Sequence, residues 1–342
     1  VLRTVPKKSS YYTEILCDLY GNPNGDNQKM NLIKASELYD KSKEVDLSKL
    51  EEKFNTIIKS NIKRDSYFKI KSGLFGTKIK GEDFDEIFET EVDSTDALAL
   101  KKELEEKKKQ EEERKTNFAK YRKKNIVGMM QDLFYMEDTH LNFILKSRKY
   151  DFDIKNFTYI GEDAVYILDF EPKGSADYKG RLYINSDDFA VLRLDYENVK
   201  PLKKFNLLGI SMNTFLGKGK MIFTKSSNNK YDLRYLEQEN GTRVGIRRPL
   251  KIIEKNKHVK GRNKQNELSL KLDMATVGVN KRELVVFDTE TIAQSAYDEF
   301  TENNTILPTY MPNYNPEFWK GHAIIEPNQA IREFTSEELI AK

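Results

Sequence analysis

Cysteine is almost absent from this chain, since Cys17 is the only one in 342 residues. A single cysteine excludes an internal disulfide bond and a cysteine-based zinc site. Histidine is nearly as rare: His140, His258 and His322 are widely separated, and none has a second histidine three or four residues away. A local metal-binding pair or a cysteine–histidine nucleophile therefore has no support. The sequence predicts no cofactor, no metal ion and no catalytic residue.

Phosphate-binding and nucleophile motifs are missing as well. The chain has no Walker A loop, no glycine-rich dinucleotide pattern after a strand and no Gly-x-Ser-x-Gly elbow. Gly217-Lys-Gly219 matches only the first spacing of the dinucleotide pattern, and such a pair is typical of a turn. These absences weaken the case for an enzyme.

An excess of charge of one sign is also lacking. The 58 basic and 55 acidic residues nearly cancel and leave a net charge of +3. Proteins that bind nucleic acid usually carry a basic excess or a basic stripe, so nucleic acid is not an expected partner. No apolar run approaches the roughly 18 residues of a membrane-spanning helix, so no transmembrane helix is predicted.

Alternation of apolar and polar residues is the main positive signal, and it recurs in five segments between Phe157 and Val286. In residues 268–274, leucines and a methionine alternate with polar and charged residues. Turn residues separate most of the segments, and Asn240-Gly241 favours a hairpin. This pattern predicts antiparallel strands with one buried face.

Helices are expected before these strands. Residues 47–62 have an apolar stripe at helical spacing. In residues 101–124, seventeen of 24 residues are charged, with acid-before-base pairs such as Glu103–Lys107. So few apolar positions favour a solvated helical arm, with a coiled-coil partner surface as the alternative. From Ile126 an apolar face begins that must pack on other parts of the chain.

Three parts follow from these patterns: a mixed N-terminal region (1–94), a helical segment with the charged arm (95–150) and an antiparallel sheet domain with a C-terminal tail (151–342). The predicted fold class is α+β, with a curved, half-barrel-like antiparallel sheet packed on helices and a long charged helix. In the tail, Trp319 follows three prolines and is expected to be buried against the sheet.

Basic residues crowd the segment after Asn240-Gly241, and they predict contact with an anionic partner such as lipopolysaccharide or phospholipid head groups. The alternative is a solvated outer strand face. The set comprises Arg243, Arg247, Arg248, Lys251, Lys255 and Lys257.

Several strings taken together resemble a known family. They are Phe157–Gly161, Ala164–Pro172, Tyr178–Asn185 and Asp188–Tyr196, with the ending Phe318–Pro327. They are similar to the Bacteroidota envelope proteins called carboxypeptidase-like regulatory domain-containing proteins, in the region that follows the regulatory module. The resemblance covers residues 150–342 and implies a periplasmic or outer-membrane-peripheral protein whose signal peptide is removed. Because the motifs are structural, they transfer no catalytic residue.

The strand order is also similar to lipoprotein carriers of the LolA type, in which a half-barrel closed by helices surrounds an apolar cavity. That resemblance implies a groove able to admit an acyl chain. The alternative is that helices fill the concave face completely. The expected groove residues are Leu233, Tyr235, Leu268, Leu270 and Leu272.

The leading functional hypothesis is a non-enzymatic binding or assembly component of the cell envelope, associated with the outer membrane. Its expected partners are a membrane-associated protein complex, lipid or lipoprotein. Three alternatives stay open: a periplasmic lipid or lipoprotein carrier, a cytosolic adaptor that uses the charged helix, and a hydrolase with dispersed catalytic residues. The hydrolase would bring acidic residues or histidines together in one pocket with shifted pKa values.

Overall fold

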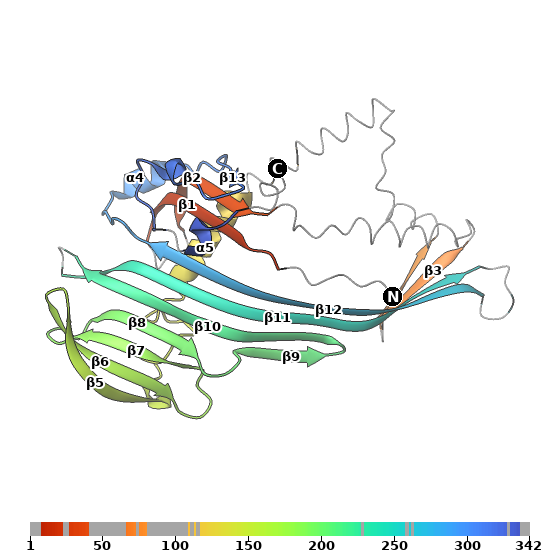
Figure 1. Cartoon of the computed structure of the whole chain (residues 1–342), viewed down its shortest axis with the longest axis horizontal. Coiled ribbons are helices and arrows are strands. Elements are labelled where there is room, and N and C mark those ends of the chain that lie inside the picture. Colours follow the sequence, from red (N-terminus) through yellow and green to blue (C-terminus); the bar gives the residue numbers. More distant parts are fainter. Residues whose placement is uncertain are drawn as a thin grey trace.

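Strands dominate the chain in a computed structural model (Figure 1). The structure describes residues 8–22, 27–40, 66–72, 75–80, 109, 113, 117–226, 229–256, 260, 263–326 and 329–335. Of these residues, 55% lie in strands and 13% in helices. The predicted α+β fold, a sheet packed on helices with a long charged helix, is therefore wrong, whereas its large antiparallel sheet is confirmed.

The large sheet has ten strands in the order β4-β3-β11-β10-β8-β7-β6-β5, with β12 beside β11 and β9 beside β10, and every pairing in it is antiparallel. Its strands are β3 (Tyr67–Ser72), β4 (Phe75–Lys80), β5 (Tyr150–Ile160), β6 (Asp163–Pro172), β7 (Tyr178–Asn185), β8 (Val191–Asn198), β9 (Lys203–Leu207), β10 (Ile210–Lys225), β11 (Tyr231–Lys255) and β12 (Lys264–Val285). Strands β5 to β8, with the adjoining ends of β10, β11 and β12, form the body of the molecule.

Strand β11 is 25 residues long and passes straight through Asn240-Gly241, so the hairpin predicted there is wrong. Gly241 pairs with Val279 inside the ladder. A β-carbon on Gly241 would lie 2.7 Å from the Phe215 ring and 2.8 Å from the Leu216 β-carbon. The glycine is thus required by a close packing contact on the strand, and the local turn propensity is overridden.

A long arm extends from the body (Figure 1). It consists of β9, residues 210–217 of β10, residues 240–255 of β11 and residues 264–280 of β12, with β3 and β4 at its far end. Strand β8 pairs with β10 only over residues 218–222, which is where the body ends.

A second, small sheet pairs a segment of the N-terminal part with one of the C-terminal part. Strands β1 (Tyr11–Tyr20) and β2 (Lys29–Tyr39) are antiparallel, and β13 (Thr309–Met311) pairs parallel with β2. The short helices are η2 (Ser147–Lys149), which leads directly into β5 of the large sheet, and α4 (Gln294–Glu299), η3 (Pro316–Trp319) and α5 (Gln329–Arg332) in the C-terminal part. Strand β3 from the N-terminal part belongs to the large sheet, and β13 from the C-terminal part belongs to the small one. Each sheet therefore contains strands from both parts of the chain.

A helix at residues 117–131 connects the two sheets. Ala119, Ile126 and Met130 pack with Met30 and Leu32 of β2. Met129 at the end of the helix belongs instead to the core of the large sheet. That core includes Leu133, Phe134, Leu141, Phe143, Phe170, Leu182, Leu194, Met221 and Leu236, so side chains fill this part of the sheet face.

Lengths explain why the described helices cover only part of the large sheet. A helix of 15 residues spans about 22 Å, whereas a strand of 25 residues spans roughly 80 Å. Within the charged run, the described residues 109, 113 and 117–124 are helical, and Ala119 among them is buried. The helix predicted at 47–62 lies outside the described residues. Of the described helices, none has the length and apolar character needed to cross a membrane.

The tail anchors on the small sheet. Trp319 is buried, and its indole Nε1 donates a 3.1 Å hydrogen bond to Glu14 Oε2 on β1. The Lys34 ammonium lies 4.2 Å from the centre of the Phe318 ring. Burial of Trp319 agrees with expectation, but the surface that buries it is the N-terminal sheet, far away in sequence.

Replacing Trp319 with alanine should lower the free energy of unfolding by about 3–5 kcal/mol, because it opens a cavity at this anchor. Urea unfolding followed by circular dichroism measures the change. Trp319→Phe is the control, since it keeps most of the apolar volume and loses only the hydrogen bond to Glu14. A loss below about 1 kcal/mol for Trp319→Ala would contradict the anchoring role.

Glu14 makes this anchor sensitive to pH. Burial raises the pKa of its carboxyl group, and hydrogen bonds from Trp319 and Ser36 only partly oppose that effect. With a raised folded-state pKa, the stability contribution is present at low pH and is lost as the pH rises through that pKa. Glu14→Gln should therefore raise the melting temperature at pH 7 more than at pH 4, whereas Glu317→Gln at an exposed position should change neither.

Candidate functional site

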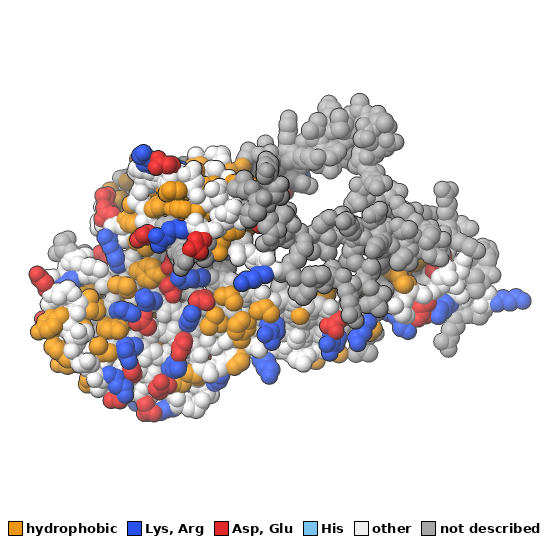
Figure 2. Space-filling view, in the orientation of Figure 1, with side chains coloured by type: hydrophobic (Ala, Val, Ile, Leu, Met, Phe, Trp, Pro, Cys, Tyr) orange, Lys and Arg blue, Asp and Glu red, His pale blue; other side chains and the backbone are white. Residues whose placement is uncertain are grey.

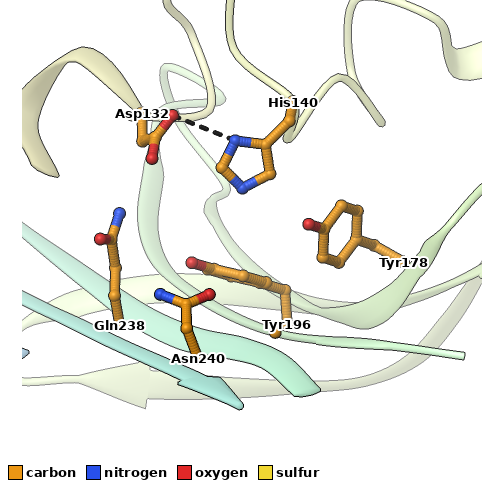
Figure 3. Close-up of a pocket in the computed structure, with 7 residues that line it drawn as sticks. Asp132, His140, Tyr178, Tyr196, Gln238 and Asn240 are labelled. Carbon is orange, nitrogen blue, oxygen red and sulfur yellow. Dashed lines mark hydrogen bonds and ion pairs between the residues drawn. The ribbon is translucent and has the colours of Figure 1, made fainter. Parts of the chain in front are cut away.

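A small hollow lies where the segment after the 117–131 helix meets the large sheet (Figure 3). Its volume is about 30 Å³, enough for one or two water molecules. The residues around it are Asp132, His140, Tyr178, Tyr196, Gly217, Gln238 and Asn240.

The most reactive pair in the hollow is Asp132 and His140. His140 Nδ1 lies 3.0 Å from Asp132 Oδ1, and the two side chains are 47% and 39% exposed. Thr139 fixes the intervening turn, because its hydroxyl donates to the Asp132 carbonyl and accepts from Leu141 N. A carboxylate that orients an imidazole is one part of an acid–base site, but serine, threonine and cysteine are all missing from the lining residues. An exposed pair of this kind typically adds only about 0–1 kcal/mol of stability.

Two tyrosines form the wall of the hollow. The rings of Tyr178 and Tyr196 meet edge to face with centroids 5.7 Å apart. Burial raises the pKa of both phenols, and the Asp132 charge adds to the effect at each. Both tyrosines are therefore protonated at neutral pH and act as neutral hydrogen-bonding groups.

Gly217 and Gly219 provide the surface on which these rings rest. Both lie inside β10, so the turn predicted at Gly217-Lys-Gly219 is wrong. A β-carbon on Gly219 would lie 2.6 Å from the Tyr196 hydroxyl and 2.3 Å from the Glu237 carbonyl oxygen. A β-carbon on Gly217 would lie 2.6 Å from a δ-carbon of Leu202, so the two glycines allow a leucine and a tyrosine to approach the strand closely.

The predicted basic residues divide between the two faces of the sheet. We name the face that carries the core residues Leu194, Met221 and Leu236 the inner face, and the opposite one the outer face. Side chains alternate along β11, so even-numbered residues share the inner face with Leu236. Arg243, Arg247, Lys251 and Lys255 therefore lie on the outer face and Arg248 on the inner face, while Lys257 lies outside the described residues.

Carboxylates accompany part of this basic set. Arg247 Nε is 3.0 Å from Asp273, and Lys251 Nζ is 3.2 Å from Glu267, both across the β11–β12 pairing. The outer face of the arm is thus a mixed but mainly basic surface.

The predicted groove residues are not brought together in one place. Leu233 packs against the core of the body, whereas the Tyr235 hydroxyl lies on the outer face, 2.8 Å from both Glu237 and Glu283. Leu268 pairs with Ile252 on the inner face of the arm, roughly 60 Å along β11 from Leu233. Leu270 and Leu272 are placed only by backbone pairing, opposite Leu250 and Arg248.

An apolar surface on the arm was missed by sequence reasoning. Its residues lie in two neighbouring rows across the inner face, and we name them the inner arm patch. Met274 is 62% exposed, Leu207 56% and Phe205 46%. The sequence signal for this patch was the apolar–polar alternation in β9 and β10. The apolar residues of these strands lie beside those of β11 only once the strands have paired. The rows are Leu207–Ile210–Ile246–Met274 and Phe205–Met212–Val244–Thr276.

On the outer face of the body, charged side chains form a regular row across the strands. Lys179, Glu197, Lys218, Glu239 and Lys281 lie opposite one another on five successive strands, and their charges alternate in sign. We name this row the charge ladder. Lys179 is 3.0 Å from Glu197, and Lys218 is 2.9 Å from Glu239. Figure 2 shows acidic and basic side chains interspersed over the body.

Comparisons of this chain with protein-family models, curated proteins and solved structures give no match. Among the described residues, no group of three or more histidines, cysteines and acidic residues is placed to hold a metal ion.

A methyl group at Gly219 tests the packing of the hollow. Gly219→Ala should destabilise the protein by about 1–3 kcal/mol, because the β-carbon meets a backbone carbonyl as well as Tyr196. Gly128→Ala is the control with the opposite sign: it lies in the helix with no atom within 4 Å of its β-carbon, so it should stabilise by about 1 kcal/mol. Equal effects of the two substitutions in chemical denaturation would contradict this account.

Proposed function

We propose that this chain is a non-enzymatic binding component of the cell envelope that contacts lipid through the inner arm patch. The observation that supports this most is the exposure of that patch. A contiguous patch of large apolar side chains that is exposed to solvent usually marks a contact site for a membrane or a partner. Location at the outer-membrane periphery is part of the proposal and rests on the resemblance in residues 150–342.

A flat contact is favoured over a carrier with an enclosed cavity. An acyl-binding cavity needs several hundred cubic ångströms, and the body places packed side chains such as Phe143, Phe170 and Leu182 where a LolA-type half-barrel would have that cavity. The open apolar rows of the arm instead suit a broad surface, into which they would insert side by side.

The hydrolase alternative has one supporting observation, the Asp132–His140 pair. No serine, threonine or cysteine lies among the residues that line the hollow of this pair, and the hollow holds only about 30 Å³. A contact function therefore has the stronger support.

The test uses two neighbouring residues on opposite faces of β9. Leu207→Asp places a charge in the inner arm patch, whereas Asn206→Asp adds the same charge on the outer face, where the strand is equally exposed. Burying a leucine stabilises by about 1.5–3 kcal/mol, so Leu207→Asp should weaken vesicle binding at least about tenfold. Asn206→Asp should change it little.

Flotation with phosphatidylethanolamine–phosphatidylglycerol vesicles measures the binding, and neutral phosphatidylcholine vesicles separate apolar insertion from charge attraction. Binding to both vesicle types that is lost only in Leu207→Asp supports the proposal. Absence of vesicle binding, or binding that Leu207→Asp leaves intact, would refute it.

A further inference from the structure

Strand β12 leaves one long edge of the large sheet open. It is 22 residues long and, among the described strands, pairs only with β11. Its side chains at 273–281 are all exposed, with Val277 at 54% and Val279 at 57%. Between residues 274 and 280 the strand has no charged residue and no proline. An edge of this kind is a template for pairing with another strand.

The opposite edge, β5, is protected in the usual ways. A register shift between Ile154 and Asn156 interrupts its ladder, and the charged residues Asp151, Asp153 and Lys155 line it. Bulges and charges on an edge strand prevent further pairing. Strand β12 runs without a register shift from Asn266 to Val285. These two edges are thus built differently, and of the two it is β12 that is ready to accept a partner.

Charges on β12 are complementary to themselves. When the strand pairs with a second copy of itself about Val277, Lys271 lies opposite Glu283 and Asp273 opposite Lys281, each twice. All four residues lie on the outer face, because they share the alternation of Glu283, which pairs with Glu237. Ala275 then meets Val279, and Val277 meets its own copy. Opposite charges and apolar pairs directly across two strands are both stabilising.

The structure assigns this edge to a second copy of the chain: we propose that two chains pair antiparallel along β12, with a twofold axis at Val277, so that the two large sheets become one. The pairing also extends the charge ladder. Lys281 at its end meets Asp273 of the other copy, and each Asp273 is already 3.0 Å from Arg247 of its own chain. The alternation of sign then continues across the interface.

Charge also fixes the register. In a pairing with a twofold axis perpendicular to the sheet, one residue lies opposite its own copy. The nearest alternative registers are therefore centred on the residue before or after Val277. Centring on Thr276 would place Lys271 opposite Lys281, and centring on Gly278 would place Asp273 opposite Glu283. Like charges directly opposite are destabilising, so both neighbouring registers are disfavoured. This inference stands apart from the proposed lipid contact, because it uses the strand edge and the outer face.

Cysteine substitution tests the position of the axis in the full chain. Val277→Cys places two thiols directly opposite each other, within reach of a disulfide bond. Val279→Cys is the matched control: same strand, same face and similar exposure, but its copy would be displaced by about 13 Å along the strand. Val277→Cys should form a disulfide-linked dimer under mild oxidation much faster than Val279→Cys. Cys17, whose thiol pKa burial raises to about 11, should remain largely unreactive in both.

Charge reversal tests the pairing without a cross-link. Sedimentation velocity should show weaker association for Lys271→Glu and for Glu283→Lys alone, by about tenfold in dissociation constant, because each creates two like-charge pairs. An equimolar mixture of the two variants should recover association, since both pairs are then of opposite sign. Lys204→Glu, on the outer face of β9, should leave association unchanged.

Recovery in the mixture distinguishes pairing from misfolding, which matters because Glu283 also accepts a hydrogen bond from Tyr235. A monomeric wild-type chain, equal cross-linking at positions 277 and 279, or a mixture that associates no better than its components would overturn the proposal.

Discussion

The large sheet depends on one constraint: consecutive side chains on each strand point to opposite faces, and the strands must pair in the register that keeps apolar residues on one face and charged residues on the other. The apolar row Leu168–Leu182–Leu194–Met221–Leu236–Leu284 crosses six strands of the inner face. One residue away on each strand, the charged row Asp169–Arg181–Asp195–Lys220–Glu237–Glu283 crosses the outer face. A slip of one residue would exchange the two rows, so burial and charge together fix the register. Each exposed ion pair is weak, but a slipped ladder would also put like charges together.

The near-balance of 58 basic and 55 acidic residues follows from this arrangement. In the body, charges neutralise one another across strands; even the adjacent carboxylates of Glu237 and Glu283 share Lys281, 3.1 Å from each. The inner face is covered in the body and exposed in the arm. It is filled by Met129, Leu133 and Phe143 near the 117–131 helix and is open in the inner arm patch. Among the described helices, the one at 117–131 has about a quarter of the length of β11, so it cannot reach along the arm.

Sequence reasoning found the strands and missed their connections. Period-two alternation is a local property, so it identified β6, β7, β8 and β12. The register shift between Ile222 and Phe223, which moves Leu233 and Tyr235 to different faces, leaves no mark in the alternation itself. The glycines at 217, 219 and 241 looked like turn signals because the side chains that approach them closely, Leu202, Tyr196 and Phe215, come from other segments of the chain. Pairing of β13 with β2 joins segments some 270 residues apart and has no local signature.

The basic residues of the arm and the inner arm patch lie on opposite faces, yet they can act on the same partner. Arg243 and Lys204 are close together on the outer face, because both lie opposite Asn213 of β10. A sheet is thin compared with the reach of its longest side chains, and the field of an exposed charge extends about 8–10 Å at physiological salt. In the lipid contact proposed above, basic side chains at the rim of a thin arm can therefore draw it toward an anionic surface, while the apolar side chains insert. In that proposed contact, the inner face supplies the apolar side chains and the outer face sets the sign of the attraction.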